Sequence, residues 1–145
     1  MRCCWTSIFA AFSFLLGQPA WPHEDETPPE GVPERLGQVT FPVSCSPGAQ
    51  EEFNRSVALL HSFYYPAAVK AFAHVTEIDP GCAMGYWGIA MSWWYPLWYP
   101  PTAASLRQGK AAVDKARSVG AKTIRERAYV EAIDAFYRDF DKQNH

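Results

Sequence analysis

Few side chains in this chain of 145 residues stand at spacings that support catalysis. A catalytic nucleophile needs a base and an orienting group within hydrogen-bond reach. His61 and Ser62 are adjacent on a predicted helix, where neighbouring side chains point apart. Glu51 and Glu52 are also adjacent, and near a helix N-terminus they are most simply a favourable charge. Since no glycine-rich phosphate loop is present either, we expect a protein that is not an enzyme and uses no cofactor.

Four soft-ligand residues raise the question of a copper site. Cys82, Met84, Met91 and His61 offer a thiolate, thioethers and an imidazole, the donors that suit this ion. Met84 and Met91 are seven apart and share one helix face, which is also the spacing of core residues. We therefore expect core packing and no metal site. A periplasmic protein that binds a metal or another small ligand is the alternative function.

The first 20 residues have the pattern of a secretory signal peptide. Met1 and Arg2 give a basic start, residues 3–16 are mainly apolar, and small or turn-forming residues lead to Ala20. This progression predicts that residues 1–20 are removed and that the protein is exported, to the periplasm or beyond. The apolar run is shorter than the ~20 residues of a membrane span, so no stable span is expected after cleavage. An uncleaved membrane anchor through residues 3–16 is the alternative.

Residues 21–42 are rich in proline and acidic side chains. Five carboxylates stand between residues 23 and 34, and the first base after them is Arg35. Such a stretch repels itself, so we expect an extended, mobile linker. Over the whole chain, 13 Lys and Arg against 15 Asp and Glu give a net charge of −2. This charge provides no basic field for nucleic acid.

Residues 43–145 have the apolar spacing of a helical domain. Ser46-Pro47 predicts the start of a first helix, and Thr102 the start of a fourth that Gly120 ends. Asp79 is expected to cap the third helix, with Pro80 in its first turn. Residues 123–126 form a capping box that opens a fifth helix. No run of period two is bounded by turns, so the predicted class is all-α, built from antiparallel helix hairpins. The apolar stripes are Phe53, Val57 and Leu60; Ala68, Phe72 and Val75; Tyr86, Ile89, Ala90 and Trp93; and Tyr129, Ile133, Phe136 and Phe140.

Cys45 and Cys82 are the two cysteines that the mature chain would keep. Cys45 precedes the first predicted helix, and Cys82 lies in the first turn of the third. In antiparallel hairpins both positions fall at the same end of the stack, where loop backbone can bring the Cα atoms within the ~7 Å a bridge allows. We predict a disulfide in the oxidising compartment, with two buried thiols as the alternative.

The order of helices and turns resembles the tetratricopeptide repeat. Residues 61–65 and 79–91 are similar to a group of exported bacterial tetratricopeptide proteins, and the resemblance extends over about residues 39–140. It implies an α-solenoid of about two hairpins plus one further helix. It also implies a non-catalytic scaffold for a protein or peptide partner, with a groove lined by exposed residues of helices 48–61 and 81–94. The residues that match the repeat are Ala68, Phe72 and Pro80 in one unit, and Tyr86, Ile89, Ala90 and Trp93 in the next.

The helical domain is expected to be incomplete at its C-terminus. A hairpin of this type cannot cover its own apolar face, and roughly three repeats are needed for stability. Phe136, Tyr137 and Phe140 lack an obvious partner helix. We interpret the chain as the N-terminal part of a longer protein, with self-association as the alternative. A longer enzyme whose accessory domain is seen here is a further alternative function.

An aromatic loop follows the third predicted helix. Trp94, Tyr95, Trp98 and Tyr99 crowd between prolines, and rigid aromatic side chains are typical anchors of a binding surface. We predict that these four residues contact the partner. The alternative is that the loop folds back and caps the hairpin.

Overall fold

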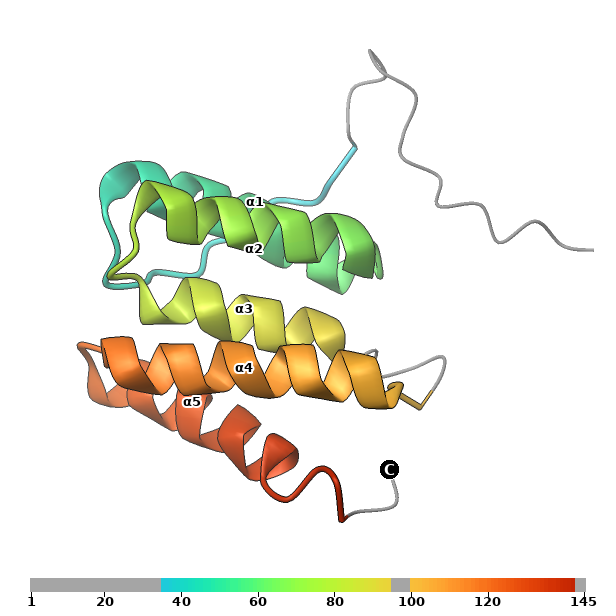
Figure 1. Cartoon of the computed structure of the whole chain (residues 1–145). Helices are drawn as coiled ribbons and strands as arrows, with labels where there is room; N and C mark the ends of the chain where they lie inside the picture. The colour runs from blue at the N-terminus through green and yellow to red at the C-terminus, as the bar shows by residue number, and fades with distance from the viewer. Residues whose placement is uncertain (1–34, 95–99, 143–145) are drawn as a thin grey trace, which may run out of the picture.

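The computed structural model describes residues 35–94 and 100–142, and all regular secondary structure in these ranges is α-helical (Figure 1). The predicted all-α class is therefore confirmed for the described residues. The predicted signal peptide, residues 1–20, and residues 21–34 of the predicted linker lie outside them. The helices are α1 (Pro47–His61), α2 (Tyr65–Ile78), α3 (Ala83–Trp93), α4 (Ala103–Val119) and α5 (Ile124–Tyr137).

Three helix starts and one helix end follow the local sequence signals. The Ser46 hydroxyl accepts the N–H of Ala49, and the Thr102 hydroxyl accepts the N–H of Ser105. Thr123 and Glu126 form the reciprocal capping box of α5. Gly120 ends α4 at φ 82°, a left-handed conformation that glycine adopts without steric cost. These predictions depend only on neighbouring residues, and all are confirmed.

The start of α3 differs from the expectation. Asp79 does not cap α3; it is the C-cap of α2, and α3 begins at Ala83 after Cys82. One carboxylate oxygen of Asp79 accepts the N–H of Gly81 at 2.9 Å, and the other accepts the N–H of Ser46 at 2.8 Å. The carboxylate thus holds the turn between two helices to the start of α1.

The helices contact one another in an orderly series. Each contacts the next along the chain, α3 also contacts α1 and α5, and within the described residues α2 does not contact α4. Phe53 of α1, Phe72 of α2 and Trp87 of α3 form the aromatic centre, with ring centroids 5.5–6.5 Å apart. Gly88 permits the close approach of α2 and α3, because a Cβ there would lie 2.1 Å from the Phe72 ring.

Tyr137 corrects the expectation that the end of α5 lacks a partner. Its side chain is fully buried, and its hydroxyl donates a 2.7 Å hydrogen bond to the carbonyl of Ala90 on α3. The ring fits over Gly109 of α4, where a Cβ would come within 2.1 Å of it. Burial raises the pKa of Tyr137, so the hydroxyl keeps the proton that it donates. Phe136 and Phe140 are partly buried and pack against the same core.

Residues 36–44 form an N-terminal strap that packs on the helices. The strap has no helix or strand, and Figure 1 shows it as an extended trace running beside α1 toward the start of that helix. Val39, Phe41 and Val43 are partly buried against the core. The packed region therefore includes residues that the sequence placed in the linker.

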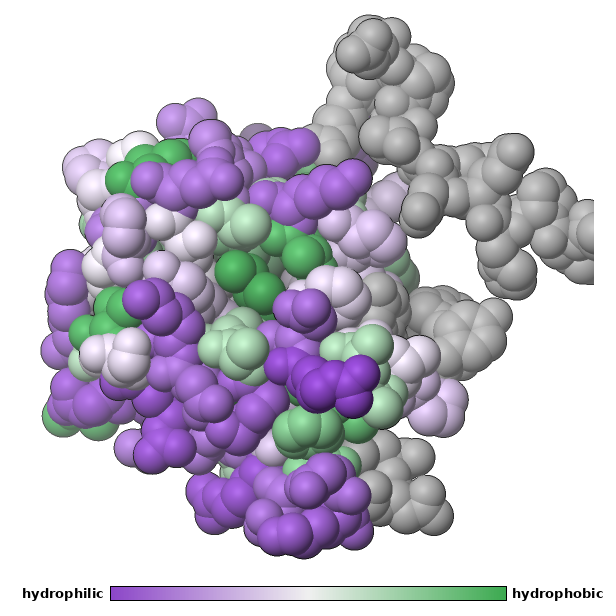
Figure 2. Space-filling view, in the orientation of Figure 1, coloured by the Kyte–Doolittle hydropathy of each residue, from purple (hydrophilic) through white to green (hydrophobic). Residues whose placement is uncertain are grey.

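The helices present two faces. The strap face is the side on which the strap packs, and it is formed by α1, α3 and α5. The outer face is the opposite side, where α2 and α4 lie toward the viewer in Figure 1. Figure 2 shows the outer face, where hydrophilic residues cover most of the surface and apolar residues form small separate areas. None of the described helices combines the length and the apolar character that a membrane crossing requires.

Candidate functional site

Phe41 places the strap against all three helices of the strap face. Its ring centroid lies 5.5 Å from that of Phe53 on α1, 6.0 Å from that of Trp87 on α3 and 5.4 Å from that of Tyr129 on α5. The guanidinium of Arg125 lies 5.1 Å from the Phe41 centroid, within the range of a cation–π contact. The three helices thus form an aromatic pocket for one side chain of an extended segment.

Two amide side chains of α1 bind the main chain of the strap. The Gln50 amide nitrogen donates to the carbonyl of Phe41 at 2.9 Å, and the Gln50 oxygen accepts the N–H of Val43 at 2.7 Å. The Asn54 oxygen accepts the N–H of Phe41 at 3.2 Å and is itself held by Gln50 at 3.1 Å. These bonds pair donor and acceptor with a peptide backbone as a neighbouring β-strand would. They require an extended backbone, and they do not depend on which side chains it carries.

The first turn of α5 binds the next residues of the strap. Arg125 donates to the carbonyl of Pro42, and Lys122, just before α5, donates to the carbonyl of Ser44 at 2.9 Å. The N–H of Ser44 donates to the carboxylate of Glu126, which is 3% exposed. A buried carboxylate needs such donors, because an unpaired one would lose its hydration without compensation.

A disulfide fixes the chain directly after the strap. Cys45 and Cys82 are joined with an S–S distance of 2.01 Å and a Cα–Cα distance of 5.0 Å. The bridge that the sequence predicts is therefore present, and it ties the start of α1 to the start of α3. Because Cys45 follows Ser44 directly, the same bond fixes the C-terminal end of the strap.

The residues that match the repeat pattern serve mainly as core. Ala68, Phe72 and Ala90 have no exposed surface. Ile89 and Trp93 are partly buried, and Pro80 is exposed in the turn before α3.

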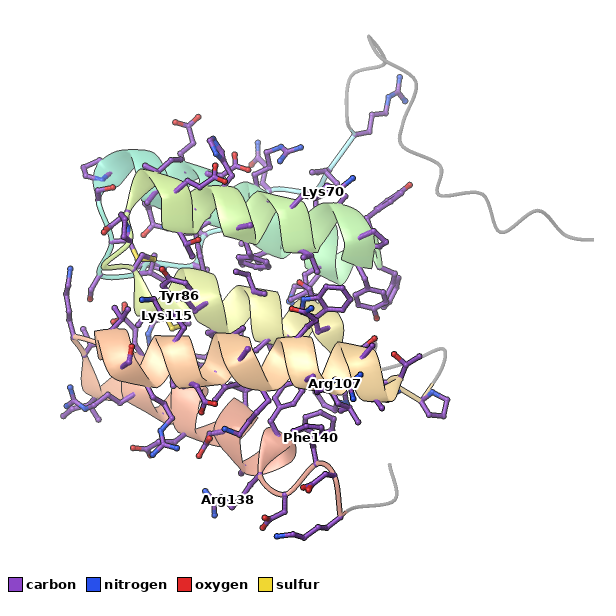
Figure 3. All side chains as sticks on the ribbon, in the orientation of Figure 1. Lys70, Tyr86, Arg107, Lys115, Arg138 and Phe140 are labelled. Carbon is purple, nitrogen blue, oxygen red and sulfur yellow. A yellow bond between two sulfur atoms is a disulfide. The ribbon has the colours of Figure 1, made fainter. Side chains whose placement is uncertain are left out.

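Tyr86, the remaining residue of the repeat pattern, lies at the junction of α3 and α4. It is partly buried, and Lys115 of α4 lies above its ring, 5.9 Å from the centroid (Figure 3). The contact joins α3 to α4.

One of the four predicted aromatic anchors lies within the described residues. Trp94 is partly buried at the end of α3, and its ring lies 4.7 Å from that of Phe136 on α5. Tyr95, Trp98 and Tyr99 lie outside the described residues. The contact of Trp94 with Phe136 gives this side chain a packing role, and its contact with a partner stays a prediction.

The copper donors do not form an open ligand set. Cys82 is in the disulfide, so it has no thiolate to offer. Met84 is 1% exposed within the core, and His61 is exposed at the end of α1. Within residues 35–94 and 100–142, no three side chains of His, Cys, Asp or Glu come together as a metal site.

A cleft of about 330 Å³ between α4 and α5 is lined by charged side chains. Arg117 donates to both oxygens of Asp134 at 3.2 Å, and Arg138 donates to one of them at 3.4 Å. Arg127 donates to the carbonyl of Ala121 at 3.3 Å. These cations therefore already bond to neighbouring oxygens. The ion pairs of Arg117 and Arg138 with Asp134 line the cleft, and the pair of Arg117 with Asp134 joins α4 to α5.

The sequence expectations did not include the residues that hold the strap, although two sequence patterns indicate them. Gln50 and Asn54 are four apart, so they share a helix face. Val39, Phe41 and Val43 alternate, the period of an extended segment with one buried side.

Comparison with known proteins adds no relative. No protein-family model, curated protein or solved structure matches this chain.

Proposed function

We propose that this protein is a non-catalytic scaffold of the tetratricopeptide type, which holds an extended segment of a partner protein against its strap face. It acts after export, as the signal-like residues 1–20 suggest. The Cys45–Cys82 disulfide supports this location, because such bonds persist in oxidising compartments.

The contacts of the helices support a solenoid of hairpins. Each helix contacts its successor, and α1, α3 and α5 form a second series of contacts. Repeats that each touch only their neighbours produce this order. Ala68 and Ala90, two positions where the repeat pattern asks for small residues, have no exposed surface.

The observation that carries the proposal is the pairing of Gln50 with the strap. One side chain donates to the carbonyl of Phe41 and accepts the N–H of Val43, while Asn54 accepts the N–H of Phe41. Main-chain bonds of this kind supply affinity for an extended peptide, and pockets for alternate side chains supply selectivity. The aromatic pocket for Phe41 is such a pocket.

A peptide selection tests the proposal. A random-peptide display library is selected on the full chain and, in parallel, on a Phe41→Ala chain whose strap has lost its ring contacts. The affinity of the enriched peptides is then measured for the parent, for a Gln50→Ala variant and for a Lys70→Ala control. Lys70 is exposed on α2, a helix of the outer face (Figure 3).

We expect enriched peptides to bind at least ~10-fold more weakly when Gln50 is replaced, because two main-chain bonds worth roughly 1 kcal/mol each are lost. The Lys70→Ala variant should bind as its parent does. The proposal fails if neither chain enriches a peptide, or if the enriched peptides are indifferent to Gln50.

A further inference from the structure

The strap is held unevenly along its length. Within the described residues, every hydrogen bond that joins residues 36–46 to the helices or their connecting turns falls on residues 41–46. Among the described residues, none joins residues 36–40 to a helix. These residues contribute only the partly buried Leu36 and Val39. The N-terminal half of the strap is therefore the half that leaves the helices at the smaller cost.

A cleft opens beside this loosely held half. It has a volume of about 510 Å³ and lies between residues 36–40 and the side chains of Asn54, Arg55 and Ala58 on α1. Asn54 lines the cleft and also accepts the N–H of Phe41. A second extended segment can thus reach one of the main-chain partners of the strap while the strap is still in place.

The disulfide determines which end of the strap stays fixed. Cys45 is bonded to Cys82, and Ser46 donates to Asp79. The C-terminal end of the strap is therefore fixed, and only its N-terminal end can leave the helices without breaking the disulfide. The strap remains tethered beside the face that it has left, so it returns quickly whenever that face is empty.

We propose that the strap is a built-in occupant of the strap face, and that an extended segment of another protein displaces it, beginning at the cleft beside residues 36–40. This rests on the proposed function. The displacing segment carries an aromatic side chain at the position of Phe41 and an apolar one two residues later, as Val43 is. The residue between these two needs no backbone N–H, because Pro42, which has none, occupies that position in the strap. The strap thereby limits binding to partners that match or exceed its own contacts.

The test uses a labelled, end-blocked peptide that copies residues 36–44, and the oxidised full chain. Fluorescence anisotropy measures its binding to the wild type, to Phe41→Ala, and to Phe41→Ala combined with Gln50→Ala. A Tyr64→Ala chain is the aromatic control, since Tyr64 is 52% exposed in the turn after α1. A peptide with alanine in place of its own phenylalanine is the ligand control.

The Phe41→Ala chain should bind the peptide at least ~10-fold more tightly than the wild type, because the competing strap has lost its aromatic contact. The Tyr64→Ala chain should match the wild type. Adding Gln50→Ala, or removing the phenylalanine of the peptide, should abolish the gain. Equal binding to wild type and Phe41→Ala would overturn strap displacement while leaving peptide binding intact. No binding to any folded chain would overturn the proposed function itself.

Two further measurements cover the cases in which Phe41→Ala does not fold or two copies of the chain exchange their straps. If circular dichroism shows that Phe41→Ala has lost its helices, Val39→Asp replaces it, because that change loosens the strap and leaves Phe41 in place. Size-exclusion chromatography over a range of concentrations detects straps exchanged between two copies. A dimer that dissociates on addition of the peptide would identify a second copy as the occupant and overturn the proposal.

Discussion

The strap face and the outer face use their polar side chains differently. On the outer face, His74 pairs with Glu77 along α2, and Lys110 pairs with Asp114 along α4. On the strap face, Gln50 and five other polar side chains of helices or their connecting turns bond to the backbone of residues 41–46.

The polar side chains of the outer face thus pair within one exposed helix, whereas those of the strap face bind the backbone of another segment. Exposed pairs three or four residues apart add a few tenths of a kcal/mol and are screened by salt. Partly buried bonds to a backbone, such as those of Gln50, Asn54 and Glu126, are stronger, and their loss leaves donors or acceptors unsatisfied. The strap face is therefore the side of the molecule on which substitutions should affect both stability and binding.

The largest effect is expected from removing the disulfide at the base of the strap. Cys45 and Cys82 are 37 positions apart, and closing a loop of this length stabilises by about 4 kcal/mol in the chain-entropy model. The double change Cys45→Ala and Cys82→Ala should lower the free energy of unfolding by that amount in urea titration. A loss below ~1 kcal/mol would show that packing alone fixes the strap base.

Phe41→Ala should have the next largest effect. The ring contacts Phe53, Trp87 and Tyr129 but is only partly buried, so we expect about 2 kcal/mol, below the ~3–5 kcal/mol of a fully buried phenylalanine. Chemical denaturation measures it, with Tyr64→Ala as the exposed aromatic control. If Phe41→Ala and Tyr64→Ala lower the free energy of unfolding by the same small amount, Phe41 does not pack as described.

Gln50→Ala should cost about 1–2 kcal/mol, since it removes two bonds to the strap and one to Asn54. Gln108, exposed on α4, provides the matched control, and its replacement by alanine should change stability by less than ~0.5 kcal/mol. Equal effects at the two glutamines would remove the distinction between the faces.

The smallest effect is expected on the outer face. The Lys110–Asp114 pair is 2.6 Å apart, but it is partly exposed and lies along one helix. A double-mutant cycle with Lys110→Ala and Asp114→Ala should give a coupling below ~0.5 kcal/mol that falls with added salt. A larger, salt-independent coupling would mean that the outer face also carries structural polar contacts.

The sequence predicts what depends on neighbouring residues or on the order of the helices. Ser46, Thr102 and the Thr123–Glu126 box mark helix starts, because caps act within one turn. The Cys45–Cys82 pair follows from the alternation of helix directions.

Contacts between distant residues could not be predicted in the same way. Tyr137 bonds to Ala90, 47 positions away, and its ring needs the space above Gly109. The strap was missed because prolines and carboxylates dominate residues 21–42, which hides the short alternation of Val39, Phe41 and Val43. Asp79 was placed at the wrong helix because its bond to Ser46 crosses 33 positions.

Amide hydrogen exchange of the strap, followed by NMR on the oxidised full chain, tests most directly whether the strap face binds an extended backbone. The amides of Phe41 and Val43 lie outside helices and strands, so protection there reports their bonds to Asn54 and Gln50. We predict that both exchange at least ~10-fold more slowly than those of Gln38 and Thr40, and that Gln50→Ala removes the protection at Val43. Exchange at Phe41 and Val43 as fast as at Gln38 and Thr40 would contradict the account.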